Sequence, residues 1–160
     1  MNLIRVTIIT ISCFFLSACD KYLVFEQNKD FENAKWFADS VCAYTFRIDD
    51  INQEYNVQYL VRNTLNYPFH NLFVKYEMKD SLGNVLRSEL QEMQLMDSKT
   101  GQPYGNGMGD IFDNKIYAFK KYKFPRKGTY TIFCTQYMRK DPIDEIMAFG
   151  IRVEKYEEGK

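Results

Sequence analysis

Residues 16–19 carry the side chains best suited to a chemical reaction, because they read Leu16-Ser17-Ala18-Cys19 and end on a thiol. A thiol is a nucleophile, and the small residues Ser17 and Ala18 leave the neighbouring backbone accessible to a signal peptidase. The pattern is that of a bacterial lipobox. We therefore expect Cys19 to accept a diacylglycerol group and, after cleavage behind Ala18, to carry the acyl chains of a mature lipoprotein. No other cofactor is expected.

A signal segment has to bring this cysteine to a membrane. A charged start ends at Arg5, and a mostly apolar run follows as far as Leu16. The run is roughly a dozen residues long, whereas a helix that spans a membrane needs about 20. Residues 1–18 are therefore expected to form a cleaved lipoprotein signal peptide; the alternative is an ordinary secretory signal with a chance cysteine. Two or more acyl chains on Cys19 would hold the remaining chain stably on a membrane.

The mature chain has the size and charge of a single domain. Removal of the first 18 of the 160 residues leaves 142, which is enough for one domain with its own core. Arg5 is the only charged residue in the removed segment, so the mature chain has 20 Lys and Arg residues and 21 Asp and Glu residues. This balance gives no basic surface of the kind that nucleic-acid binding requires. The 13 Phe and 12 Tyr are instead typical of a chain that packs rings on β-sheets.

Two cysteines remain inside the domain. Cys13 leaves with the signal and Cys19 is lipidated, so Cys42 and Cys134 are left. Each alternates with large apolar residues, which predicts that both lie in the buried layer of the domain. A periplasmic location permits a disulfide between them, but two buried free thiols fit the pattern equally well. Both states stay open at this point, because spacing alone does not give the geometry of a bridge.

An alternation of apolar and polar residues dominates the chain from residue 41 onward. Residues 55–62 and 72–79 each show the period of two that predicts a half-buried strand. The polar turn at residues 80–84 then predicts a hairpin. Its second strand would cover residues 85–96, although the apolar residues there also fit a helical stripe.

The second half of the chain continues the β pattern. Residues 97–109 contain four glycines and one proline, a density that predicts a long irregular loop. Further strands are predicted at residues 116–124, 129–137 and 146–155. Roughly seven short strands without an amphipathic helix predict an all-β fold, an antiparallel β-sandwich of jelly-roll type. We place the sandwich at residues 36–156 and expect residues 19–35 to form a lipidated tether, because they are polar and show no period.

The remaining reactive side chains form no recognisable catalytic or metal site. The single histidine, His70, lies in a turn-like stretch with no nucleophile or orienting carboxylate beside it in the sequence. Asp110, Asp113 and Asn114 offer oxygen ligands of the type that Ca²⁺ takes, but their spacing is not that of an EF-hand. The glycine-rich residues 105–109 lack the Lys-Ser/Thr pair of a phosphate-binding loop. We therefore predict no enzyme, no catalytic residues and no bound metal.

Recognition residues are expected on the loops that a rigid sandwich presents. We predict partner contacts on the loops at residues 66–71 and 103–114, through Tyr67, Phe69, Tyr104 and Asp110. Rings supply apolar contact area, and a carboxylate fixes the register of a partner. The alternative is that the three rings fold inward and only close the end of the sandwich.

Five segments follow one another in an order that matches one known family. They are residues 36–50 (WFADSVCAYTFRIDD), 55–73 (YNVQYLVRNTLNYPFHNLF), 105–116 (GNGMGDIFDNKI), 128–139 (GTYTIFCTQYMR) and 150–155 (GIRVEK). The most specific pieces are Arg62-Asn63 through Tyr67-Pro68-Phe69, Gly109-Asp110-Ile111 and Gln136-Tyr137-Met138-Arg139. Over nearly the whole mature domain, the chain resembles the GldH family of gliding-motility lipoproteins from Bacteroidetes.

This resemblance implies a non-enzymatic structural or assembly component of the gliding-motility machinery, linked to type 9 protein secretion. Its partners would be other lipoproteins or membrane subunits of that machinery. The alternative function is a carbohydrate-binding surface lipoprotein, since β-sandwiches often present sugar sites, although a fold alone does not give a function. Asp20 directly after Cys19 argues for the inner membrane under the enterobacterial sorting rule, which is unreliable in Bacteroidetes. We expect the outer membrane, with the domain facing the periplasm.

Overall fold

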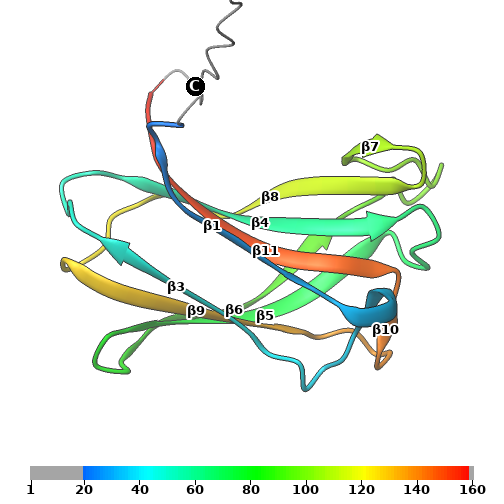
Figure 1. The fold of residues 1–160 in the computed structure, drawn as a ribbon, viewed down its shortest axis with the longest axis horizontal. Coiled ribbons are helices and arrows are strands. Elements are labelled where there is room, and N and C mark those ends of the chain that lie inside the picture. The colour runs from blue at the N-terminus through cyan, green and yellow to red at the C-terminus, as the bar shows by residue number, and fades with distance from the viewer. Residues whose placement is uncertain (1–19, 159–160) are drawn as a thin grey trace, which may run out of the picture.

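The computed structural model describes residues 20–158, and these residues fold into two packed β-sheets (Figure 1). The first sheet has the strand order β1-β11-β4-β8-β7, and the second has the order β3-β9-β5-β6. Nothing helical within residues 20–158 is long or apolar enough to cross a membrane. The signal segment and Cys19 lie outside the described residues.

The strands differ in length, and the long ones make up the two sheets. The first sheet contains β1 (Leu23–Asp30), β11 (Ile146–Lys155), β4 (Tyr55–Thr64), β8 (Ile111–Tyr122) and β7 (Asn106–Met108). The second contains β3 (Cys42–Ile48), β9 (Gly128–Gln136), β5 (Asn71–Asp80) and β6 (Val85–Gln94). A separate short ribbon pairs β2 (Lys35–Trp36) with β10 (Ile143–Asp144), just after the 3₁₀ turn η1 (Glu32–Ala34).

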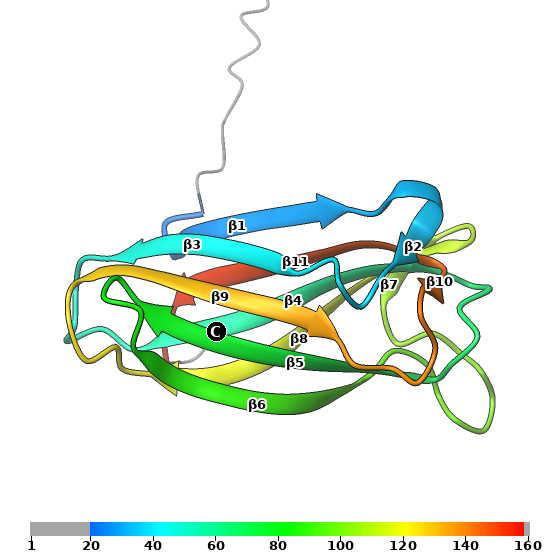
Figure 2. The ribbon, with the colours of Figure 1, turned by 90° about the horizontal axis from the view of Figure 1, so that it is seen from below.

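The long strands follow the winding of a jelly roll. β1 pairs with the last strand β11, β3 pairs with β9, β4 pairs with β8, and β5 pairs with β6, all antiparallel. Successive pairs fall alternately in the first and the second sheet, so one long folded ribbon of chain is rolled across both layers. Figure 2 shows the second sheet in front of the first. The prediction of an all-β, jelly-roll-like sandwich is confirmed.

The predicted alternation fills the space between the two sheets. In β3, Cys42, Tyr44, Phe46 and Ile48 are buried while the residues between them are exposed. Cys134 on β9 is equally buried, so the expected position of both cysteines in the inner layer is confirmed. The core is largely aromatic. Its centre includes Phe149, whose ring centroid lies 4.7 Å from that of Trp36 and 5.5 Å from that of Tyr59.

The predicted hairpin at residues 80–84 is confirmed. The Asp80 carboxylate accepts hydrogen bonds from the N–H groups of Leu82 and Asn84, both at 2.9 Å. Gly83 has a φ of +83°, a conformation that side chains with a Cβ rarely adopt. The turn therefore rests on an aspartate and a glycine that suit it, and the strand interpretation of residues 85–94 holds over the helical one.

Two boundaries in the second half of the chain were predicted incorrectly. The strand expected at residues 116–124 begins earlier, at Ile111, and the loop expected at residues 97–109 includes the short strand β7. These two segments form a tight hairpin around Gly109, which has a φ of +65°. Glycine density marked the turn correctly but hid the short paired segments on both sides of it.

The tether predicted at residues 19–35 is wrong for most of its length. Leu23–Asp30 form β1, the edge strand of the first sheet, in antiparallel register with β11. Gly150 on β11 permits this close pairing, because a Cβ there would lie 2.5 Å from the Gln27 carbonyl oxygen. Most side chains of this edge strand face solvent, so its sequence stays polar although its backbone is fully ordered in the sheet. The sandwich thus begins at Leu23, shortly after the predicted lipidation site.

The sandwich has two ends, and the described chain begins and finishes at the same one. We call one the anchor end; it contains Asp20 and the turns at residues 49–54, 81–84 and 123–127. We call the other the distal end; it contains the loops at residues 31–41, 65–70, 95–110 and 137–145 (Figure 1, right). Both termini of the described chain lie at the anchor end, where the Lys155 N–H donates to the Tyr22 carbonyl oxygen at 2.8 Å. The described chain, which begins directly after the predicted lipidation site, therefore enters the fold at the anchor end.

Candidate docking groove and anchor site

The two loops predicted for recognition lie together at the distal end. The Leu65 N–H donates to the Asp110 carbonyl oxygen at 2.8 Å, which ties the end of β4 to the turn before β8. The N–H groups of Leu95 and Tyr104 donate to the carbonyl oxygens of His70 and Leu95, each at 2.9 Å. Backbone hydrogen bonds therefore join residues 66–71 and 103–114 into one surface.

Tyr67 does not belong to that surface, so its predicted role as a partner contact is wrong. Its side chain is only 4% exposed, and its hydroxyl donates to the Asn71 carbonyl oxygen at 2.9 Å. Burial raises the pKa of the Tyr67 phenol. The ring of Phe69 lies edge-on to it, with 5.8 Å between the centroids, and is itself half-buried. Tyr67 is thus the inward anchor of the loop, and it presents Phe69 at the surface.

Tyr104 and Asp110 are exposed, as their predicted role requires. The Tyr104 ring is 60% exposed, and its hydroxyl lies 3.2 Å from the Asp97 carboxylate. Backbone and hydroxyl hydrogen bonds from Thr100 and Lys99 lower the pKa of Asp97, which therefore stays ionised beside the phenol. Tyr104 does not line the same hollow as Phe69, so the structure does not bring the four predicted residues into a single site.

An apolar groove opens on the outer face of the second sheet at the distal end. It has a volume of about 590 Å³. Its floor and walls are Phe69, Phe73, Leu90, Tyr137 and Met138, with Arg139 and Lys140 at one rim. Leu90 and Tyr137 are exposed although both are large and apolar. We call this feature the distal groove, and of the four predicted contact residues only Phe69 lines it.

A buried amide holds one wall of the distal groove in place. Gln136 is 1% exposed, and its side-chain oxygen accepts the Met138 N–H at 2.8 Å. Its side-chain nitrogen lies 3.4 Å from both the Lys140 carbonyl oxygen and the Asp141 carboxylate. The Met138 sulfur in turn accepts the Phe73 N–H at 3.3 Å. The segment after β9 is therefore fixed by a satisfied polar group, and the groove is preformed.

Some charged residues around the distal groove form ion pairs within the described part of the chain, and others do not. Lys140 pairs with Asp144 at 2.5 Å, and this hydrogen bond lowers the pKa of the Asp144 carboxyl. Arg139 forms no ion pair or hydrogen bond with any residue in the described part of the chain, and Lys75, the register partner of Leu90, forms no ion pair there. The groove thus combines apolar lining residues with one cation, Arg139, that is available to an incoming carboxylate, and Lys75 lies next to Leu90 on the neighbouring strand.

Sequence reasoning missed most of this groove, although one signal for it was present. In residues 71–80 the alternation assigns Leu72, Val74, Tyr76 and Met78 to the core, which puts Phe73 on the solvent face among lysine and glutamate. Leu90 stands out in the same way on β6. A large apolar residue at a solvent-facing strand position, where the alternation predicts a polar residue, indicates a surface contact site better than a large apolar residue in a loop does.

The other reactive side chains are separate from the distal groove. His70 is exposed, and its backbone carbonyl accepts hydrogen bonds from the next loop. Asp113 forms a bidentate ion pair with Arg62 at 2.8 and 3.2 Å, while the Asn114 amide donates to Asn63 at 2.9 Å. Within residues 20–158, no group of three or more His, Cys, Asp or Glu side chains is arranged to hold a metal ion.

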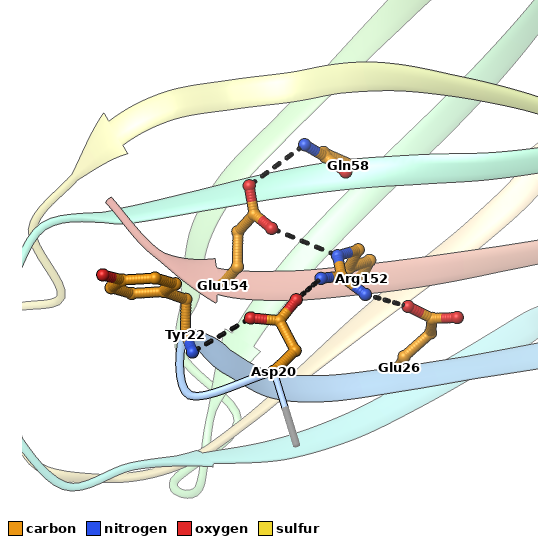
Figure 3. A network of polar contacts seen from close by, with 6 residues as sticks. All are labelled: Asp20, Tyr22, Glu26, Gln58, Arg152 and Glu154. Carbon is orange, nitrogen blue, oxygen red and sulfur yellow. Dashed lines mark hydrogen bonds and ion pairs between the residues drawn. The ribbon is translucent and has the colours of Figure 1, made fainter. Parts of the chain in front are cut away.

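At the anchor end, one arginine gathers three carboxylates. Arg152 on β11 forms ion pairs with Asp20, Glu26 and Glu154, and its contact with Glu154 measures 3.1 Å (Figure 3). Gln58 donates to the other oxygen of Glu154 at 3.3 Å. Partial burial lowers the pKa of Arg152, but the hydrogen bonds to the carboxylates outweigh it and raise the pKa above its ordinary value. We call this cluster the Arg152 clamp.

The Arg152 clamp makes Asp20 part of the fold. One carboxylate oxygen of Asp20 pairs with Arg152, and the other accepts the Tyr22 N–H at 3.1 Å. The backbone carbonyl of Asp20 accepts the Leu23 N–H at 3.0 Å. Cys19, the predicted lipidation site, is the next residue toward the N-terminus and lies outside the described residues. A single peptide bond therefore separates the predicted acylation site from a fixed residue.

Solved structures match the chain only at a low level of similarity. A structure of infectious bursal disease virus (Gx strain) aligns with a TM-score of 0.35 and 9% identity, over 85% of this chain and 30% of that one. Dimeric latent PorU from Porphyromonas gingivalis aligns with a TM-score of 0.34 and 7% identity, over 84% of this chain and 13% of that one.

Sequence comparison gives a closer relationship. Residues 23–153 match the family model described as GldH lipoprotein. The chain is 30% identical to the gliding motility lipoprotein GldH of Flavobacterium johnsoniae, over 92% of this chain and 94% of that protein. It is 29% identical to the gliding motility lipoprotein GldH homolog of Christiangramia forsetii, over 94% of each. The family match extends across both sheets, and the chain belongs to the GldH lipoprotein family.

Proposed function

We propose that this protein is a gliding-motility lipoprotein that acts as a non-enzymatic assembly component of the motility machinery, linked to type 9 protein secretion. The observation that carries the proposal is the distal groove, a preformed apolar surface at the end of the sandwich opposite the lipobox. Relatives of nearly the same length are named as gliding motility lipoproteins. In this role the protein binds another subunit and performs no chemical step.

The lining of the distal groove favours a protein partner over a sugar. A sugar site places several hydrogen-bonding side chains beside its rings, because every hydroxyl of the ligand needs a partner. Five of the seven residues around the groove are apolar, and the two polar ones are cations at the rim. A peptide segment that offers a large apolar side chain next to an acidic residue fits this arrangement. We propose such a segment of another envelope subunit as the occupant.

The lipid anchor completes the proposed role. Acylated Cys19 would keep the domain on a membrane, and we propose the outer membrane with the domain facing the periplasm. Since the distal groove lies at the end of the sandwich away from Asp20, it would remain open to a partner while the anchor end faces the lipid. The partner set is other lipoproteins or membrane subunits of the same machinery.

Two matched variants on one strand test the proposal. Leu90 lines the groove and Val85 does not, yet both are exposed apolar residues of β6, at 51% and 53%. In a host strain that lacks its own copy, Leu90→Asp should weaken recovery of the partner by about tenfold or more, corresponding to about 1.4 kcal/mol of binding, and should reduce gliding. Val85→Asp should leave both unchanged.

The readout combines affinity capture from mild-detergent extracts with mass spectrometry and a gliding assay. Melting temperatures of the two purified variants should agree, which shows that Leu90→Asp does not act through unfolding. Arg139→Glu should weaken capture in the same direction as Leu90→Asp, because an acidic partner segment would face a like charge. Normal capture and gliding in Leu90→Asp would exclude the groove as the docking site, and binding of glycans to the wild-type protein, lost in Leu90→Asp, would replace the proposal by a sugar site.

A further inference from the structure

A second surface surrounds the Arg152 clamp at the anchor end. Its members are lysines and tyrosines from three separated parts of the chain. The Lys21 ammonium lies 4.6 Å from the centroid of the Tyr22 ring, that of Lys120 lies 4.0 Å from Tyr117, and that of Lys121 lies 4.5 Å from Tyr156. We call these six residues the lysine–tyrosine surface.

A local irregularity of β8 creates part of this surface. Consecutive residues of a strand normally point to opposite faces, yet Lys120 and Lys121 are both exposed. Lys121 has a φ of +52°, an unfavourable conformation for a residue with a side chain, and its N–H donates to the Asn56 side chain at 3.2 Å. The strand is bulged here relative to β4. The bulge brings two neighbouring lysines to the outside, each over its own tyrosine.

The lysine–tyrosine surface is continuous with the start of the chain. Tyr117, Lys120, Lys121 and Tyr156 line one hollow of about 400 Å³, together with Glu154 and Glu157. The Lys155 N–H bonds to the Tyr22 carbonyl, which places residues 21–22 beside it. Glu154 is already engaged by Arg152 and Gln58. Tyr22 and, to a smaller extent, the nearby Glu157 raise the pKa of Lys21. The surface therefore offers several ammonium groups and phenol rings, with Glu157 beside them and with Glu158 and Glu54 near Lys121.

This chemistry matches the headgroup layer of a bilayer. Lysine ammonium groups bind phosphate, and tyrosine rings favour the boundary between water and hydrocarbon because they are apolar at one end and polar at the other. A carboxylate beside the lysines suits the ammonium of phosphatidylethanolamine. Asp20 is held by Arg152 and is the residue directly after Cys19, so a lipid on Cys19 would enter the bilayer next to this surface.

We propose that the lysine–tyrosine surface rests on the phospholipid headgroups of the leaflet that holds the Cys19 acyl chains. The domain then lies on the membrane in one orientation, with the distal groove turned away from the lipid. This inference rests on acylation of Cys19, which is part of the proposed function, but it is independent of what the groove binds.

Two tyrosine-to-tryptophan variants test the orientation. Tyr117 belongs to the lysine–tyrosine surface and is 43% exposed; Tyr104 lies at the distal end and is 60% exposed. The one native tryptophan, Trp36, is buried in the core and provides the same background in both variants. Each full-length protein, with its acyl chains verified by mass, is reconstituted into vesicles of phosphatidylethanolamine and phosphatidylglycerol that carry bromine near the glycerol backbone.

Bromine quenches tryptophan only at short range. We expect Tyr117→Trp to lose emission relative to vesicles without bromine, and Tyr104→Trp to keep it. Adding Lys21→Glu and Lys121→Glu to Tyr117→Trp should remove the quenching, while the acylated chain stays bound to the vesicles. Equal quenching of both tryptophans, or quenching of Tyr117→Trp that persists after charge reversal, would overturn the inference. If the chain carries no acyl groups on Cys19, both the proposed orientation and the proposed lipid anchor are wrong. Loss of partner capture alone would leave the proposed orientation unaffected.

Discussion

Cys42 and Cys134 lie directly opposite each other on the neighbouring strands β3 and β9, and neither side chain is exposed. The sequence left a disulfide and two free thiols open, and the structure has both thiols free. Burial raises the pKa of both, that of Cys134 well above its ordinary value of 9.0. Two thiols in this position are protonated and shielded, so they react slowly as long as the sandwich is folded.

Thiol titration should reveal this shielding. We expect purified mature protein, kept free of reductant, to show no reaction with a thiol reagent under native conditions and two reactive thiols per chain after denaturation. Each of Cys42→Ala and Cys134→Ala should lower the denatured count to one. A denatured count of zero in the wild-type chain would instead reveal a bridge between the two residues.

The free energy of unfolding should decrease at alkaline pH. A raised pKa in the folded state stabilises the fold fully below the unfolded pKa and loses this contribution as the pH rises toward the folded pKa. For the two thiols this loss begins near pH 9.0. Each group contributes a slope of up to about 1.4 kcal/mol per pH unit. Urea unfolding at a series of pH values should show the decline, and Cys42→Ala combined with Cys134→Ala should reduce its slope without abolishing the tyrosine contribution at higher pH.

Two buried tyrosines should respond differently to loss of the hydroxyl. The Tyr44 hydroxyl donates to the Phe149 carbonyl oxygen at 2.5 Å, whereas the Tyr76 hydroxyl has no hydrogen-bond partner within the described residues. Tyr44→Phe removes this buried hydrogen bond and should cost about 0.5 to 1.5 kcal/mol of unfolding free energy. Tyr76→Phe should be neutral or stabilising, because it removes a buried polar atom that has no hydrogen-bond partner within the described residues. Burial of this hydroxyl also raises the pKa of the Tyr76 phenol to about 12. Equal losses in the two variants, measured by urea unfolding, would contradict this assignment.

The lipobox makes a prediction of its own. Cys19→Ser removes the thiol that would accept diacylglycerol, so the variant should neither label with fatty acid nor enter the detergent phase on partitioning. The soluble domain should still fold with an unchanged melting temperature, because the described fold begins at Asp20. Fatty-acid labelling and membrane partitioning that persist in Cys19→Ser would disprove the lipoprotein anchor.

Sequence patterns predicted the half-buried strands well. β3, β5 and β9 each bury one face, so every second residue had to be apolar, and the period was visible without any further information. β1 escaped prediction because it is an edge strand. β1 pairs with β11 through backbone groups, and the absence of a side chain at Gly150 gives it room to do so. Neither feature requires apolar residues to alternate along β1, so its sequence shows no strand period.

The candidate sites were predictable only in part. Phe69 could be selected because it is a ring in a predicted loop. Tyr67 looks equivalent in the sequence, but its hydroxyl reaches the Asn71 carbonyl inside the fold. The distal groove joins β5, β6 and the segment after β9, and the Arg152 clamp joins Asp20 to a residue near the C-terminus. Both depend on the winding of the jelly roll, which places distant segments side by side.

The fixed position of Asp20 also bears on the entropy of assembly. A lipoprotein domain on a long flexible linker samples many heights and tilts, and a partner has to remove that freedom when it binds. If Cys19 carries the acyl chains as proposed, only one peptide bond would separate it from Asp20, and little freedom would be left to remove. A partner diffusing in the same leaflet would then meet the domain at a nearly constant height, and the search for the complex would be one in two dimensions with a high effective concentration.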